Sequence, residues 1–116
     1  GPEGAKALAM VSSELRLAKL DLSRCRLGDE GARVLGRWLG GSNSSAQCLT
    51  ELGLDDNFIG PEGAQSIAEM LKKNNFLKTL QMFDNVCGPE GAFAIAEGLK
   101  KNRSLKILDF SSNICG

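Results

Sequence analysis

The stretch LKTLQMFDNVCG, residues 77–88, recurs with small changes in three other places along the chain. Its counterparts are LAKLDLSRCRLG at 17–28, LTELGLDDNFIG at 49–60 and LKILDFSSNICG at 105–116. All four fit the pattern L-x-x-L-x-L-x-x-N/C-x-L-G, in which Met, Phe, Ile or Cys can stand for Leu. A pattern of this length that repeats in register indicates an array of similar structural units.

A second motif, Gly-x-Glu-Gly-Ala, starts on the final glycine of three of these stretches and also opens the chain. Its four copies are separated by 27, 32 and 28 residues. A period in this range is typical of a solenoid, in which each unit buries its apolar face against its neighbours. We therefore interpret the chain as one domain of four units, 1–27, 28–59, 60–87 and 88–116.

Each unit is predicted to contain one short strand with one buried face. In the third unit Leu80 and Met82 alternate with polar residues, as such a strand requires. Successive strands are separated by a helical crossover, so they pair in parallel. An Asn follows the strand in three units and can bond the backbone of its own and the next unit, whereas Cys25 weakens this bonding in the first. The expected strands are 19–22, 51–54, 79–82 and 107–110.

The residues that follow each Gly-x-Glu-Gly-Ala motif keep a helical period. Pro61 and Pro89 suit the first helical position, where no intrahelical N–H is needed. The expected helices are 2–11, 29–40, 61–73 and 89–101. The buried faces predicted for the last two helices are Ala64, Ile67, Ala68 and Leu71, then Ala92, Ile95, Ala96 and Leu99.

The complete unit, L-x-x-L-x-L-x-x-N-x-I-G-x-E-G-A-x-x-I-A-x-x-L-K-x-N, resembles the ribonuclease-inhibitor-like class of leucine-rich repeats. Similar units are found in ribonuclease inhibitor, the GTPase-activating protein of Ran, tropomodulin and NOD-like receptors. The resemblance covers essentially the whole chain and implies an α/β solenoid, a segment of a right-handed horseshoe. It implies a parallel sheet on the concave face, helices on the convex face, and use as a protein-binding scaffold.

Composition narrows the classes of partner. The 14 basic and 14 acidic residues balance, so no general attraction to nucleic acid or anionic lipid is expected. No apolar run approaches the ~18 residues of a membrane span. The four cysteines, Cys25, Cys48, Cys87 and Cys115, are too scattered for a zinc or disulfide framework. We therefore predict a reduced, cytoplasmic protein with a protein partner, without metal, nucleic acid or membrane.

No catalytic or cofactor-binding arrangement is predicted. The chain contains no His, the commonest general base and metal ligand, and no G-x-x-x-x-G-K-[ST] phosphate loop. Asp55 and Asp56 adjoin, but neighbours on a strand point to opposite faces, so they are not expected to work as an acid and base pair. The sequence therefore does not predict an enzyme.

The predicted binding surface is the outward face of the strands and the residues directly after them. Phe83 stands out on this face, because large aromatic residues are enriched among those that dominate binding energy. The alternative for Phe83 is a ring partly covered by the neighbouring units. The predicted partner-binding residues are Lys19, Asp21, Glu51, Asp55, Asp56, Gln81, Phe83, Asp84 and Asp109.

Two other functions stay open at this point. A GTPase regulator similar to the Ran-activating protein would orient groups already on the GTPase. A structural spacer would have no dedicated ligand.

The two ends of the chain fall at the same point of the repeat, at Gly1 and Gly116, and neither carries the polar capping unit that solenoids need. We expect either a piece of a longer array or head-to-tail self-association, which produces open assemblies or rings.

Overall fold

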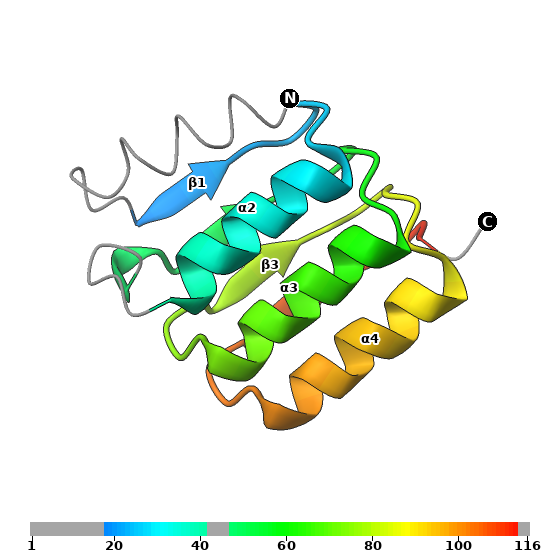
Figure 1. Ribbon diagram of the computed structural model, residues 1–116. Coiled ribbons are helices and arrows are strands. Elements are labelled where there is room, and N and C mark those ends of the chain that lie inside the picture. Colours follow the sequence, from blue (N-terminus) through cyan, green and yellow to red (C-terminus); the bar gives the residue numbers. More distant parts are fainter. Residues whose placement is uncertain (1–17, 42–46, 114–116) are drawn as a thin grey trace.

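The computed structural model describes residues 18–41 and 47–113, in which three helices cover one face of a four-stranded sheet. Figure 1 shows α2, α3 and α4 side by side in one layer, with the strands in a second layer behind them. The predicted helix at 2–11 lies outside the described residues. The elements are β1 (Lys19–Asp21), α2 (Gly28–Gly40), β2 (Glu51–Gly53), α3 (Pro61–Lys73), β3 (Thr79–Gln81), α4 (Gly88–Lys101) and β4 (Ile107–Asp109).

The sheet is parallel and its strand order, β1-β2-β3-β4, follows the sequence. The register places Leu20, Leu52, Leu80 and Leu108 opposite one another. Every described element thus lies within one residue of its predicted boundaries, and the predicted α/β solenoid with a parallel sheet is confirmed.

The core lies between the sheet and the helix layer. Leu80 and Met82 of the third unit are fully buried, as are Ile67 and Leu71 on the inner face of α3. Each unit therefore contributes a layer of side chains that is closed only by its neighbours.

The Asn residues after the strands connect adjacent units. Asn85 Nδ2 donates to the carbonyls of Leu54 and Met82, at 2.9 and 3.1 Å. Its Oδ1 accepts from the N–H groups of Asn57 and Ile59, at 2.9 and 3.1 Å. Asn85 thus bonds its own unit and the preceding one, whereas the sequence predicted the next one, because the side chain points back toward the N-terminal neighbour.

The outer side of α4 differs from the prediction. Ala92 is half-buried and Ala96 is exposed, although their counterparts Ala64 and Ala68 are buried. Within residues 18–41 and 47–113, α3 packs against helices on both sides, while α4 packs only against α3. Of the four residues predicted for the buried face of α4, only Ile95 is buried, because α4 has a helix neighbour on one side alone within the described residues.

Candidate functional site

The sheet face turned away from the helices, the concave face of the expected horseshoe, carries the predicted site residues. Lys19, Asp21, Gln81 and Asp109 on the strands are exposed, and Glu51 is half-buried. The three described helices, α2, α3 and α4, cover the opposite face (Figure 1). This face is therefore open for a partner.

A hollow of about 450 Å³ lies on this face, near the carboxyl ends of β1, β2 and β3. Five predicted site residues line it together with two others. We call it the acidic hollow, and its lining residues are Asp21, Ser23, Arg24, Asp55, Asp56, Phe83 and Asp84.

Hydrogen bonds hold two of these carboxylates in place. Ser23 donates to Asp21 Oδ1 from its hydroxyl at 2.6 Å and from its backbone N–H at 3.0 Å. These two bonds, the hydroxyl first, lower the pKa of Asp21 below its usual value. Asp55 Oδ1 accepts the backbone N–H of Phe83 at 2.7 Å, across to the next unit. Asp55 thereby fixes the position from which the Phe83 ring, 42% exposed, projects.

The turn after each strand decides which side chains reach the acidic hollow. Arg24, Asp56 and Asp84 occupy one equivalent position and all have positive φ, at 60°, 55° and 59°. This left-handed conformation interrupts the alternation of an extended strand. Asp55 and Asp56 therefore line the same hollow, which corrects the prediction that they face opposite sides.

The acidic hollow is strongly negative. Four carboxylates line it and a single guanidinium opposes them. That group, Arg24, lies 3.9 Å from Asp56, and both side chains are substantially exposed, so the pair is weak. Among the described residues no group of three Asp, Glu, Cys or His side chains is arranged to hold a metal ion. The chemistry that the hollow favours is contact with a basic group of a partner.

A second, smaller hollow of about 220 Å³ adjoins it over β1, β2 and β3. Gly53 lies at its centre, between Asp21 and Gln81 on the neighbouring strands. A Cβ at Gly53 would lie 2.9 Å from Asp21 Oδ1, so the missing side chain is what opens this hollow. Lys19 and Glu51 lie on its rim, 3.6 Å apart as an ion pair.

Eight of the nine predicted site residues thus line one of the two hollows. Asp109 lines neither hollow, because it lies on β4, whereas both hollows lie over β1, β2 and β3. Ser111 donates to Asp109 from both its hydroxyl and its backbone N–H. These bonds lower the pKa of Asp109. Ser23, Arg24 and Gly53 were expected on this open face but were not among the predicted partner-binding residues. Ser23 lines the acidic hollow through its bonds to Asp21, Arg24 lines it beside Asp56, and Gly53 lines the smaller hollow.

Two further observations concern the buried thiol and the helices. Cys87 is fully buried, and burial raises the pKa of its thiol to about 12, with the nearby charge of Asp29 adding to the effect. Cys87 is therefore a small residue of the core. None of the described helices is long and apolar enough to cross a membrane.

Comparisons with known proteins agree with this architecture. A family model described as Leucine Rich repeat matches residues 17–36, 45–68 and 73–96, more than half of the chain. No curated protein matches the chain. Among solved structures, the Leiomodin-1 Actin-Binding Site 2 is similar, with a TM-score of 0.83 and 25% sequence identity. The match covers 94% of this chain and 62% of that one, so the chain spans less than two thirds of the leiomodin structure.

Proposed function

The chain belongs to the leucine-rich-repeat family, and we propose that it is a protein-binding module that holds its partner on the concave face of the sheet. The observation that carries this proposal is the acidic hollow, in which an exposed aromatic ring adjoins four carboxylates. Aromatic anchors surrounded by polar groups are typical of the energetic centre of protein interfaces.

The partner's surface should complement both features. A Lys or Arg would meet the carboxylates of Asp55, Asp56 and Asp84, and an adjacent apolar group would cover the Phe83 ring. A cation over the ring face would gain further stabilisation. Because this attraction is electrostatic, we expect association to slow as the salt concentration rises.

Actin is the first defined partner to test, because a similar fold forms an actin-binding site in leiomodin-1. Purified actin and proteins captured from a cell extract can be compared on the immobilised chain. A GTPase among the captured proteins, with faster GTP turnover when the chain is added, would support the GTPase-regulating alternative. The absence of any selective partner would support the structural spacer.

The decisive experiment compares two phenylalanines. Phe83→Ala removes the ring beside the acidic hollow, whereas Phe93→Ala removes a more exposed ring, 68% accessible, from α4 on the opposite face. If Phe83 anchors the partner, its loss should weaken binding by about 30-fold, the equivalent of a 2 kcal/mol hot spot. Phe93→Ala should leave the affinity unchanged. Partner binding that survives Phe83→Ala and is lost with Phe93→Ala would place the interface on the helical face instead.

Head-to-tail self-association is a separate proposal for the β4 end. Leu108 and Phe110 are only half-buried, whereas their counterparts Leu80 and Met82 are fully buried. A second copy stacked on β4 would cover them and would extend the sheet. Sedimentation over a range of concentrations tests this, and a monomer at every concentration would contradict it.

A further inference from the structure

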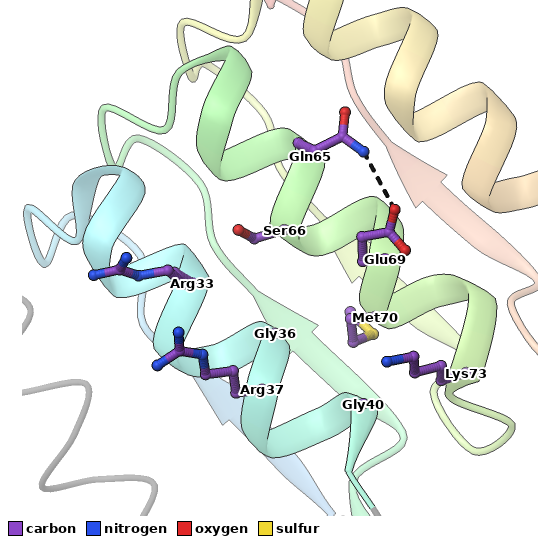
Figure 2. A pocket seen from close by; sticks show the side chains of 9 residues that line it. All are labelled: Arg33, Gly36, Arg37, Gly40, Gln65, Ser66, Glu69, Met70 and Lys73. Atoms are coloured by element: carbon purple, nitrogen blue, oxygen red, sulfur yellow. Dashed lines mark hydrogen bonds between the residues drawn. The ribbon is translucent and has the colours of Figure 1, made fainter.

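A groove of about 230 Å³ runs along the helical face, between α2 and α3. Arg33 and Arg37 line the groove on the α2 side, and Figure 2 shows their guanidinium groups directed away from α3. Met70 and Lys73 extend from α3 toward α2 on the other, while Glu69 points to the far side of α3. We call this feature the helix groove. It lies on the opposite face from the acidic hollow and shares no residue with it.

Two glycines of α2 create the helix groove. A Cβ at Gly36 would lie 2.9 Å from the carbonyl oxygen of Ser66, so Gly36 allows α3 to pack closely. Gly40 is different, because a Cβ there would meet Met70 Cα at an ordinary 3.5 Å. A Cβ at Gly40 would thus be in ordinary contact with Met70 and with Lys73 Cδ at 3.9 Å, so the missing side chain leaves a shallow place beside the Lys73 stem. The equivalent position in α3 is Lys72.

The floor of the helix groove is apolar and its rim is basic. Met70, 1% exposed, forms part of the floor beside the backbone of Gly36 and Gly40. Arg37 stands at the position where α3 and α4 have Glu69 and Glu97. The charge at this position is thus reversed in α2 alone among the three described helices.

The positive charges on the rim are not all committed. Arg33 is paired with Glu30, and Glu69 accepts from Lys72 at 3.2 Å. Within residues 18–41 and 47–113, neither Arg37 nor Lys73 makes an ion pair, although one stands on each side of the groove. A ligand that brings carboxylates would find two cations available.

The size of the helix groove selects the kind of ligand. Small-molecule sites usually enclose about 300–1,000 Å³, so this groove suits one or two side chains better than a cofactor. We propose that the helix groove docks an acidic amphipathic segment of a protein partner. An apolar side chain of the segment lies over Gly40 and Met70, and its carboxylates pair with Arg37 and Lys73. This interface is independent of the concave one, whose negative charge repels the same segment.

The test uses a synthetic helical peptide of Leu and Glu, and the same peptide with Lys in place of Glu. Binding to the whole chain is measured by fluorescence anisotropy. The Glu peptide should bind and the Lys peptide should not. Arg37→Glu, which installs the residue found in α3 and α4, should weaken binding of the Glu peptide by about tenfold or more. Lys101→Glu, at the position in α4 equivalent to Lys73, should have little effect.

Gly40→Lys separates docking in the groove from general attraction. It places at Gly40 the residue that α3 has at the equivalent position, Lys72, and its side chain would occupy the groove beside Met70, yet it adds a positive charge. Attraction to a basic surface alone would strengthen binding of the Glu peptide, whereas occlusion of the groove weakens it. Circular dichroism of each variant verifies that the helices are retained.

Three results would overturn the proposal: no binding of the Glu peptide, equal affinity for wild type and Arg37→Glu, or tighter binding by Gly40→Lys. Stronger binding to vesicles of phosphatidylcholine and phosphatidylserine, or to single-stranded RNA, would assign the basic rim to lipid or nucleic acid instead. Phe83→Ala should not change affinity for the peptide, so this experiment and that on the concave face fail independently.

Discussion

The substitution Asn85→Ala tests how adjacent units are held together. It removes two accepted bonds, from the N–H groups of Asn57 and Ile59, and two donated bonds, to the carbonyls of Leu54 and Met82. All four groups belong to buried residues. Alanine offers no replacement partner, and the packed neighbours leave little room for water to supply one.

The expected magnitude follows from the two N–H groups. Each buried donor left without an acceptor costs about 1 to 3 kcal/mol, and the carbonyls add less because part of their bonding capacity can be met elsewhere. We therefore expect Asn85→Ala to lower the free energy of unfolding by about 3 to 5 kcal/mol. Cys25→Ala, at the equivalent position of the first unit, should cost less than about 1 kcal/mol, because a thiol contributes little hydrogen bonding.

Urea unfolding followed by circular dichroism measures both losses, with linear extrapolation to water. Asn75→Ala is the matched control, because Asn75 is exposed and its loss should stay within about 0.5 kcal/mol. A loss below about 1.5 kcal/mol for Asn85→Ala, at an unchanged urea dependence, would refute the reasoning. Equal losses for Asn85→Ala and Cys25→Ala would refute the special role of the amide.

Three further predictions concern the core and the helix ends. Leu80→Ala, at a fully buried position in the middle of the sheet, should cost about 2 to 5 kcal/mol in urea unfolding, and a loss under about 1 kcal/mol would contradict its core position. Asp29→Ala should lower the free energy of unfolding by about 1 kcal/mol, because Asp29 Oδ1 caps α3 by accepting the N–H groups of Gly60 and Gly63 at 2.7 and 2.8 Å. Asp29→Asn should recover part of this loss in the same assay. The Cys87 thiol, with its pKa raised from 9.0 to about 12, should resist a thiol reagent in the folded chain. The stability that the protonated thiol contributes is complete below pH 9 and is lost as the pH rises toward 12. Cys87→Ala should abolish this loss of stability in melts recorded over that pH range.

Much of the fold could be predicted because each unit repeats the same local pattern. The alternation of Leu80 and Met82 with polar residues determines which face of the strand is buried, and the spacing of Ile67 and Leu71 does the same for the helix. Registered copies of these patterns also predict a parallel sheet, since every strand is followed by a crossover. The exposed ring of Phe83 followed from the same alternation.

The candidate site was predicted less completely, because its shape depends on backbone conformations and on gaps between units. Asp56 reaches the acidic hollow only because its φ is 55°, and no pattern of apolar residues reports that angle. Gly53 and Gly40 were visible in the sequence, but whether a glycine leaves a hollow depends on what the neighbouring unit places beside it.

The sequence by itself determined the period of the chain, the faces of its strands and helices, and the set of polar residues on the open side of the sheet. Only the tertiary structure decided how residues about 30 positions apart meet. Asp29 caps the helix of the following unit, Asp55 binds the backbone of Phe83, and Arg37 stands across a groove from Lys73. The physical reason is that periodicity specifies the direction of a side chain within its own unit, whereas contacts between units depend on how closely their backbones pack, which the residues of both units set together.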